Sequence, residues 1–258
     1  MAFTNQQFSL AGKVAIVTGA GGREHSIGRA YALALANAGA KVVAADINAE
    51  GAARVAAEIG ESAIGVQVDI TSRASVAAMV EQVTAKFGGV DILVNNAALM
   101  VDIGWSPAHV IGEEEWNRAI AVNLSGALNC AQAVVPSMTA RGGGRIVNQL
   151  SAGAFPAQTV YGVTKVALLG LTTTLATELG KHGITVNAIA PGMTTSAAGL
   201  SLTPPDSPLV QAISSKTPIH HMADPDELCG PLLMLVSDAG KWMTGQTLNV
   251  DGGWVMRG

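Results

Sequence analysis

Residues 13–38, KVAIVTGAGGREHSIGRAYALALANA, decide the fold of this chain. The stretch begins with a short apolar run, passes through a glycine-rich turn after Thr18, and ends in an alanine-rich segment from Ile27 to Ala38 that is typical of a helix. A strand, a glycine turn and a helix in this order open a dinucleotide-binding unit. Glycines let a pyrophosphate approach the backbone, and the helix N-terminus adds unpaired N–H groups. An ordinary strand-to-helix turn has the same glycines, so this stretch alone leaves both interpretations open.

The next apolar run, KVVAAD at residues 41–46, predicts a second buried strand that ends at Asp46. A carboxylate at this strand end can accept hydrogen bonds from both hydroxyls of an adenosine ribose, and it would repel a 2′-phosphate. Asp46 therefore favours NAD over NADP. Two alternatives stay open, because Asp46 could instead cap the helix that begins near Ala49, and Arg23 beside the glycine turn could reach a phosphate.

Strands and helices continue to alternate along the chain. Further apolar strands are predicted at residues 64–69, 90–95, 144–150, 183–191 and 246–250. Helices are predicted at residues 73–87, 113–138, 225–237 and over the segment that carries Tyr161 and continues to about Lys181. Near-continuous apolar strands between helices predict an α/β fold, with a doubly wound parallel sheet and helices on both faces. Ligands bind beyond the carboxyl ends of such strands. Those ends carry Asp46, Asp69, Ile70, Asn95, Ala97 and Ser151.

The composition argues against several classes of protein. Of the 258 residues, 49% are apolar and 13% are charged, so the chain can bury a large core, and we expect one domain over residues 1–258. The net charge of −4, without a basic cluster, argues against nucleic acid and anionic membranes as partners. No bounded apolar run is long enough to predict a membrane span, and the first residues lack the pattern of a signal peptide. Cys130 and Cys229 have no metal-type spacing, so we expect no metal site and a reducing, cytoplasmic setting.

A second stretch, SAGAFPAQTVYGVTK at residues 151–165, carries the candidate chemistry. Tyr161 and Lys165 are four residues apart, which places both on one face of a helix, and Ser151 lies a short loop upstream. A hydroxyl donor, a tyrosine and a lysine can move a proton on and off an alcohol oxygen. The spacing alone also fits a solvated helix face, but here it follows the strand that delivers Ser151 to the predicted ligand edge. Asn123, a poor residue for the middle of a helix, either makes a structural hydrogen bond or belongs to a polar relay beside the site.

Residues 193–222 lose regular periodicity and contain four prolines among Ser, Thr, Met, Leu and Ala. An embedded connection of this length is usually functional. We therefore expect a substrate-covering loop with a short helix, and a disordered insertion is the alternative. His220 and His221 are adjacent, do not share a helix face and lack an evident third ligand, so they predict no metal site.

Together these motifs resemble the short-chain dehydrogenase/reductase family over essentially the whole chain. The matching residues are Thr18-Gly19, Ile27-Gly28, Asp69, Asn95-Asn96-Ala97, Asn123, Ser151, Tyr161 with Lys165, Pro191-Gly192 and GQTLNVDGG at residues 245–253. The resemblance implies a Rossmann-like domain with a seven-stranded parallel sheet, and commonly a homotetramer. It also implies a catalytic set of Asn123, Ser151, Tyr161 and Lys165. The expected cofactor contacts are Gly19, Ser26, Ile27, Asp46, Asp69, Ile70, Asn95, Ala97, Tyr161, Lys165, Pro191, Gly192 and Thr194.

Two features depart from the family pattern. The family turn is usually T-G-x-x-x-G-x-G, whereas TGAGGREHSIG is three residues longer and has Ser26 in place of the middle glycine. Some enoyl reductases of the same superfamily have a longer turn with a serine, but their tyrosine spacing differs. Ser151 and Tyr161 are ten residues apart, three fewer than is common, so the loop that lines the substrate pocket is expected to be tighter.

The expected mechanism uses Tyr161 as the acid/base. Its ordinary pKa of about 10 is too high for a base near neutral pH. An ammonium about 4 Å away, at an effective dielectric constant of about 20, supplies roughly 4 kcal/mol, enough to lower that pKa by about 3. Lys165 is therefore expected to activate Tyr161 and to hold the nicotinamide ribose. Ser151 would orient the substrate oxygen, and Asn123 would position a water that connects Lys165 to solvent.

Three functions are consistent with the sequence. The first is an NAD-dependent oxidoreductase for a secondary alcohol or ketone with an apolar or cyclic skeleton, which the Met, Leu and Ala content of residues 193–222 favours. The second is an NADPH-dependent 3-oxoacyl reductase, which Asp46 and the lack of a basic patch for an acyl carrier disfavour. The third is a non-catalytic nucleotide-binding protein, which the complete catalytic set argues against.

Overall fold

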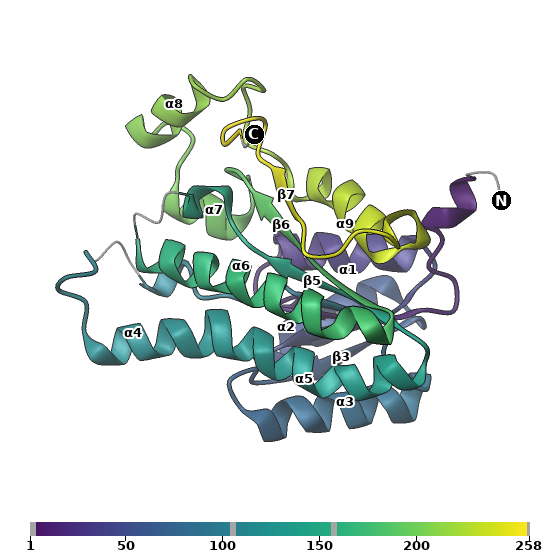
Figure 1. The fold of residues 1–258 in the computed structure, drawn as a ribbon. Helices are drawn as coiled ribbons and strands as arrows, with labels where there is room; N and C mark the ends of the chain where they lie inside the picture. The colour runs from purple at the N-terminus through teal and green to yellow at the C-terminus, as the bar shows by residue number, and fades with distance from the viewer. Residues whose placement is uncertain (1–3, 104–106, 156–158, 257–258) are drawn as a thin grey trace.

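A seven-stranded parallel sheet forms the centre of the computed structural model, which describes residues 4–103, 107–155 and 159–256 (Figure 1). The strands are β1 (Val14–Thr18), β2 (Lys41–Asp46), β3 (Ala63–Gln67), β4 (Ile92–Asn95), β5 (Gly144–Gln149), β6 (Ile184–Pro191) and β7 (Thr247–Val250). They lie in the order β3-β2-β1-β4-β5-β6-β7, and each neighbouring pair is parallel. The predicted α/β fold is therefore confirmed. The strand order reverses between β1 and β4, and a crevice for ligands forms at such a reversal.

Helices cover both faces of the sheet, because successive strand residues point to opposite sides. One face is covered by α1 (Ile27–Asn37), α2 (Ala49–Ile59) and α9 (Cys229–Val236), which pack against the Ala15 and Val17 side of β1. The other face is covered by α3 (Arg73–Phe87), α5 (Gly126–Ala140) and α6 (Val160–Leu179), which pack against its Val14 and Ile16 side. With both faces buried, β1 is apolar along its length up to Thr18.

Two predicted elements are subdivided in the structure. The helix predicted at residues 113–138 consists of α4 (Glu113–Ile120), a π-helical turn (Ala121–Ser125) and α5. The substrate-covering loop predicted at residues 193–222 holds two short helices, α7 (Ala197–Leu202) and α8 (Pro208–Ser214), where one was expected. A 3₁₀ turn (Pro225–Leu228) precedes α9.

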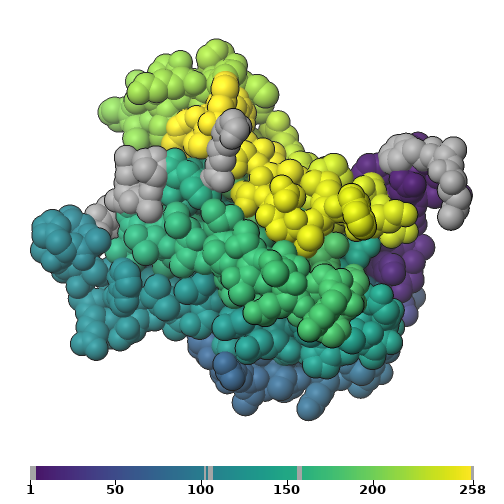
Figure 2. Space-filling model, in the orientation of Figure 1, coloured from purple at the N-terminus to yellow at the C-terminus, as the bar shows by residue number. Residues whose placement is uncertain are grey.

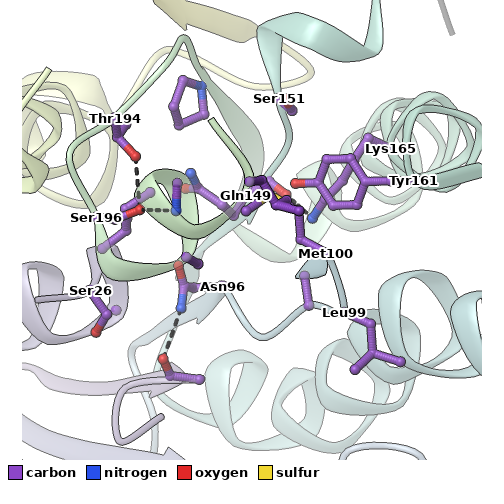
Figure 3. A pocket seen from close by; sticks show the side chains of 18 of the residues that line it. Ser26, Asn96, Leu99, Met100, Gln149, Ser151, Tyr161, Lys165, Thr194 and Ser196 are labelled. Atoms are coloured by element: carbon purple, nitrogen blue, oxygen red, sulfur yellow. Dashed lines mark hydrogen bonds between the residues drawn. The ribbon is translucent and has the colours of Figure 1, made fainter. Parts of the chain in front are cut away.

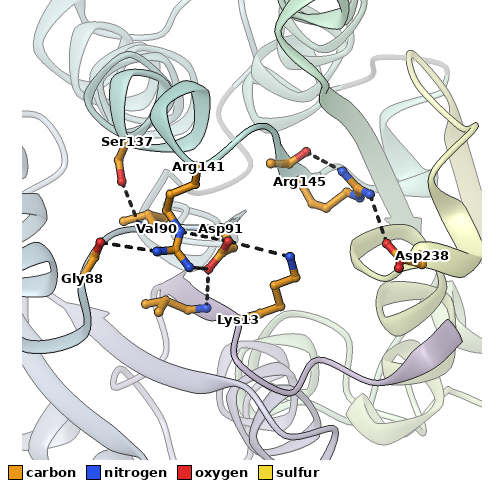
Figure 4. Close-up of polar contacts among 10 residues, drawn as sticks. Lys13, Gly88, Val90, Asp91, Ser137, Arg141, Arg145 and Asp238 are labelled. Atoms are coloured by element: carbon orange, nitrogen blue, oxygen red, sulfur yellow. Dashed lines mark hydrogen bonds and ion pairs between the residues drawn. The ribbon is translucent and has the colours of Figure 1, made fainter. Parts of the chain in front are cut away.

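A charged cluster ties the elements together at the amino edge of the sheet (Figure 4). The Asp91 carboxylate, just before β4, accepts a hydrogen bond of 2.9 Å from the Val14 backbone N–H of β1. Arg141, at the end of α5, donates two hydrogen bonds to the same carboxylate, at 3.0 and 2.8 Å. The Lys13 ammonium lies 3.9 Å from an oxygen of the Asp91 carboxylate. This cluster stands at the edge opposite the carboxyl ends of the strands and so belongs to the scaffold.

Two helical segments are long and apolar enough to cross a membrane by length and composition alone. They are Glu113–Ala140 and Val160–His182, and 39% and 44% of their most apolar windows are buried inside the fold. Both contribute core residues against the sheet. Packing against the sheet accounts for part of their hydropathy.

Candidate active site

A cavity of about 940 Å³ lies at the carboxyl edge of the sheet (Figure 3). Its lining runs from the glycine turn, through the ends of β2, β4 and β5, to α7 and α8. Thirteen of the expected site residues line it: Gly19, Ser26, Ile27, Asp46, Asp69, Ile70, Ala97, Ser151, Tyr161, Lys165, Pro191, Gly192 and Thr194. Two do not, Asn95 and Asn123. The strand ends therefore bring most of the predicted residues to one cavity.

The glycine turn needs its glycines for steric reasons. Gly19 has φ +70°, and a Cβ there would lie 2.7 Å from the Ala97 Cα. A Cβ on Gly28 would overlap the Gly19 carbonyl oxygen. Asn96 holds the turn from the β4 side, because its amide donates hydrogen bonds to the Thr18 and Gly19 carbonyls at 3.0 and 3.1 Å. Ser26 caps α1 by accepting a hydrogen bond from the Arg29 N–H at 3.2 Å. The backbone thus lies open to the cavity at the start of a helix, the geometry that suits a phosphate.

The lengthened part of the turn reaches across to the segment that covers the cavity. The His25 carbonyl accepts a hydrogen bond of 2.7 Å from the Ala197 N–H at the start of α7. The His25 Nε2 lies 3.4 Å from the Thr195 hydroxyl and 3.3 Å from an Asp224 carboxylate oxygen. The added residues therefore connect the phosphate-type turn to residues 195–224.

Asp46 is almost buried and is held by two backbone groups. Its carboxylate accepts hydrogen bonds of 2.9 Å from the Gly21 and Asn48 N–H groups. Asn48, and not Asp46, caps α2, because the Asn48 side chain accepts from the Gly51 N–H at 3.1 Å. The alternative in which Asp46 serves as the helix cap is therefore wrong. Asp46 is fixed in orientation and faces the cavity.

Asp69 has a local role as well as a place in the lining. Its carboxylate accepts hydrogen bonds from the Thr71 N–H at 2.9 Å and from the Thr71 hydroxyl at 2.6 Å. These bonds fix the turn after β3 and with it Ile70, whose side chain lies against Gly126 of α5.

Asn95 was expected to contact the cofactor, but it does not line the cavity. Its amide donates hydrogen bonds to the Ala127 carbonyl at 3.2 Å and to the Asn148 side chain at 2.9 Å, inside the layer between β4, β5 and α5. The cavity is lined instead by the following residues, Asn96, Ala97 and Ala98. Asn95 is the last residue of β4 and still points into the core, whereas the chain turns to the cavity one residue later.

Ser151, Tyr161 and Lys165 converge on the cavity from β5 and α6. Figure 3 shows the Tyr161 hydroxyl pointing into the cavity below Ser151. Thr159 caps α6 and so fixes the turn that carries Tyr161. The Lys165 side chain is 1% exposed. Its ammonium donates a hydrogen bond of 2.7 Å to the Gln149 carbonyl and lies 5.4 Å from the centre of the Tyr161 ring.

Burial dominates the titration of both groups. Burial raises the pKa of Tyr161, and the Ser151 hydroxyl lowers it only in part. Burial lowers the pKa of Lys165 from 10.5 to about 7. The Lys165 ammonium is directed at Gln149 and is itself desolvated, and the expected activation of Tyr161 by this lysine stays a prediction. At neutral pH Tyr161 holds its proton.

The Asn123 side chain makes its hydrogen bonds inside the fold. It is 1% exposed and lies in the π-helical turn. Its side-chain oxygen accepts a hydrogen bond of 2.7 Å from the Leu99 N–H. Its side-chain NH₂ group donates hydrogen bonds to the Leu99 carbonyl at 2.9 Å and to the Thr164 hydroxyl at 3.1 Å. All of these bonds are structural, so the side chain holds the loop after β4 and the turn of α6 beside Lys165. These bonds support the structural alternative for the side chain, and a water positioned by Asn123 stays a prediction.

Several lining residues were not singled out from the sequence. Gln149 is one, and its side-chain oxygen accepts a hydrogen bond of 2.9 Å from the buried Tyr31 hydroxyl. A polar residue near the end of an apolar strand is the signal that could have identified it. Trp254 is another, and a Cβ on Gly153 would lie 3.2 Å from its ring. Residues 156–158 of the shortened loop lie outside the described residues.

Metal ligation finds no support in the part of the chain that the structure describes, where no group of three His, Cys, Asp or Glu side chains is placed to hold an ion. His221 contacts Glu227 at 2.9 Å, whereas His220 contacts the Ser214 carbonyl at 3.1 Å. The two adjacent histidines therefore have separate partners.

The chain is similar to known oxidoreductases over nearly its whole length. A family model described as enoyl-(acyl carrier protein) reductase matches residues 21–255. An uncharacterized oxidoreductase of Mycobacterium tuberculosis is 45% identical over 95% of this chain and 98% of that protein. A short chain dehydrogenase/reductase of Aspergillus oryzae is 39% identical over 98% of each chain. D-threitol dehydrogenase of Mycolicibacterium smegmatis is 37% identical over 97% of this chain and 95% of that protein.

Solved structures agree with this likeness. A 7α-hydroxysteroid dehydrogenase in complex with NADH and 7-oxo glycochenodeoxycholic acid has a TM-score of 0.90 and 35% identity, over 99% of both chains. A gluconate 5-dehydrogenase from Burkholderia cenocepacia J2315, in complex with NADP and tartrate, has a TM-score of 0.89 and 35% identity, over 96% of this chain and 97% of that chain. One neighbour holds NADH and the other NADP, so likeness alone leaves the choice of nicotinamide cofactor open.

Proposed function

Because the chain belongs to the short-chain dehydrogenase/reductase family, and is therefore an oxidoreductase of alcohol or ketone substrates, we propose that it uses NAD(H) and acts on a secondary alcohol or ketone with an apolar or cyclic skeleton. The observation that carries the proposal is the single cavity that runs from the glycine turn and Asp46 past Tyr161 to the apolar residues of α7 and α8. A dinucleotide along the first part would end beside Tyr161 and leave the second part for a substrate. We also infer that residues 1–258 form one domain.

The residues of the first part fit a dinucleotide. Gly19 and Gly28 have no room for side chains, which leaves backbone at the surface of the cavity. The Asp46 carboxylate, fixed by the Gly21 and Asn48 N–H groups, suits the two hydroxyls of an adenosine ribose and would repel a 2′-phosphate. This preference supports NAD. Arg23, which also lines the cavity, is the residue that would work against it.

Each catalytic residue has a distinct task in this proposal. Tyr161 keeps its proton at neutral pH because burial raises its pKa, so it would donate that proton to a ketone oxygen during reduction. Ser151 would hold the same oxygen and stabilise the charge that develops on it. A bound nicotinamide would supply or accept the hydride. Lys165 would hold the nicotinamide ribose and, when protonated, favour the Tyr161 phenolate needed for alcohol oxidation.

The lining of the second part supports an apolar skeleton. Met193, Leu202, Leu209, Ile213 and Trp254 face this part of the cavity. Apart from the Trp254 indole N–H, these side chains offer no hydrogen bonds, so most hydroxyls of a polyol would lose their hydration there without replacement. A ring or an alkyl chain would instead gain from burial.

We further propose that the enzyme is a cytoplasmic homotetramer without a metal, a nucleic acid partner or a membrane partner. Apolar side chains that lie on the surface support the assembly, since Trp242 is 97% exposed and Met256 is 77% exposed. Light scattering on the purified protein tests the assembly, and the mass of a single chain would contradict it.

The experiment that tests the function follows NADH and NADPH absorbance with a panel of cyclic, alkyl and polyol ketones and alcohols, and a 3-oxoacyl thioester. We expect turnover of apolar ketones with NADH. Tyr161→Phe should lower that turnover by roughly 10²- to 10⁴-fold and leave NADH binding nearly intact. Tyr31→Phe removes the hydroxyl of the other tyrosine in the chain, which does not line the cavity, and should cost far less. Near-wild-type turnover in Tyr161→Phe would refute the assignment, and preferred use of the thioester with NADPH would favour a 3-oxoacyl reductase.

A further inference from the structure

Charged residues are distributed unevenly around the cavity. Among the lining residues that the structure describes, five are charged: Arg23, Asp46, Asp69, Lys165 and Lys216. The first three belong to the glycine turn and the ends of β2 and β3, and Lys165 bonds to the Gln149 carbonyl. Lys216 is thus the one charged lining residue, within the described chain, that lies in the segment proposed to cover the substrate.

Lys216 has a fixed backbone and a free head group. It follows α8, and its N–H donates to the Ile213 carbonyl at 3.0 Å. Thr217 beside it is 5% exposed, and its hydroxyl donates to the same carbonyl at 2.9 Å. The Lys216 side chain is exposed and makes no hydrogen bond or ion pair with any described residue. The acidic residue of segment 193–222, Asp206, does not line the cavity.

A chain of contacts places Lys216 on the same wall as the catalytic serine. Thr217 lies against Gly252, and Pro218 lies against Gly253. Figure 2 shows the light-green α8 segment and the yellow C-terminal residues side by side at one end of the molecule. Trp254, next in the chain, lies against Gly153, two residues after Ser151. The wall from Ser151 through Trp254 to Lys216 is therefore continuous, with an apolar middle and a cation at its outer end.

From this arrangement we propose that the substrate carries an anionic group at the end remote from the reacting carbon, and that Lys216 binds this group. The inference rests on the proposed function and adds a specificity-determining residue to it. An apolar body would lie against Trp254, Leu209 and Ile213 while its anion meets the ammonium of Lys216. Two sources supply such an anion, a free carboxylic acid or the phosphate of an acyl thioester carrier.

The test compares charged ligands with neutral partners of the same shape, by titration calorimetry on the NADH-saturated protein. One pair is 7-oxo glycochenodeoxycholic acid and its methyl ester, and a medium-chain oxo acid and its ester form a second. A 3-oxoacyl coenzyme A and the corresponding N-acetylcysteamine thioester form the third. We expect at least one anion to bind about fivefold more tightly than its neutral partner, as for an exposed ion pair. The preference should shrink as salt is raised.

The variants separate an ion pair from general loss of structure. Lys216→Met should abolish the preference without weakening the neutral ligand, Lys216→Arg should retain it, and Lys216→Glu should reverse it. Lys181→Met removes an exposed lysine that does not line the cavity and should behave as wild type. A preference confined to the acids identifies a carboxylate, and one confined to coenzyme A identifies a carrier phosphate.

The inference is overturned if no anion binds more tightly than its neutral partner, or if the preference survives in Lys216→Met. Its failure is distinct from failure of the proposed function. Turnover of neutral ketones that depends on Tyr161, without any preference for anions, would refute the role of Lys216 alone. A preference that persists in Tyr161→Phe, together with unchanged turnover in that variant, would instead refute the catalytic assignment alone.

Discussion

Replacing Lys165 by methionine should abolish catalysis and at the same time stabilise the protein at neutral and acidic pH. Lys165 is 1% exposed, and burial lowers its pKa from 10.5 to about 7. Below pH 7 the buried, protonated lysine therefore lowers the free energy of unfolding by about 5 kcal/mol. Methionine has a similar length and no charge to desolvate. Since it also loses the hydrogen bond to the Gln149 carbonyl, the net gain should be smaller, about 3 kcal/mol.

The stability of the wild type should rise with pH, whereas Lys165→Met should lack this rise. Between pH 7 and 10.5 the unfolded chain binds more protons at Lys165 than the folded protein does, so the stability of the wild type rises with pH in this window. From pH 6 to pH 9 the rise should amount to about 3 kcal/mol relative to Lys165→Met. Urea unfolding over this range measures it, and staying below pH 10 avoids ionisation of tyrosine in the unfolded chain. Lys181→Met serves as the control for an exposed lysine.

Two results would refute this reasoning. One is a Lys165→Met variant that is less stable than wild type at pH 6. The other is a difference in stability that stays constant from pH 6 to pH 9, because a lysine that remains protonated in the folded protein gives no such slope. Either result would mean that the folded protein offsets the desolvation of the Lys165 ammonium more fully than its surroundings indicate.

Three further predictions concern the two edges of the sheet. Asp46→Ser should raise the ratio of kcat/KM for NADPH over NADH by about tenfold, because it removes a negative charge that would repel a 2′-phosphate in the proposed site. A parent enzyme that already prefers NADPH would contradict this prediction. Gly28→Ala should weaken NADH binding and cost about 1–3 kcal/mol in urea unfolding, because the Cβ overlaps the Gly19 carbonyl. Gly170→Ala, whose Cβ meets nothing within 4 Å, should be neutral or stabilising, and equal behaviour of the two variants would argue against the steric account. Asp91→Ala should lower the free energy of unfolding by about 3 kcal/mol, because it leaves Arg141 and the Val14 N–H without their partner. The KM for NADH should stay unchanged, and a shift in that KM would mean that the amino edge is coupled to the site.

The strands and the glycine turn could be predicted because their causes are local. A run such as KVAIVT is buried on both sides, and a turn that approaches other backbone needs glycine wherever it stands in the chain. The prediction that Asn95 faces the cavity is wrong by one position along the chain. The sequence has two adjacent asparagines, and only the point at which β4 ends decides which of them faces the cavity.

Properties that depend on tertiary surroundings could not be predicted from spacing. The four-residue interval placed Tyr161 and Lys165 on one helix face, but their pKa values are set by burial. Asn123 looked like a polar relay because asparagine is unusual inside a helix. Its partners, Leu99 and Thr164, come from other elements and become visible only once these pack around the π-helical turn.

The two departures from the family pattern meet in the same cavity. The lengthened turn does not carry its extra residues towards solvent, because His25 bonds to the start of α7 and lies beside Asp224. On the opposite wall, where the connection from Ser151 to Tyr161 is short, Trp254 of the C-terminal turn lies against Gly153. The longer turn therefore supports residues 193–222 from the side of the glycine turn. The C-terminal turn supports the same residues from the side of Ser151, through the contacts of Gly252 and Gly253 with Thr217 and Pro218. Residues 193–222 are thus held from both ends, which makes α7 and α8 a fixed wall of the cavity, the wall that in our proposal would contact the substrate.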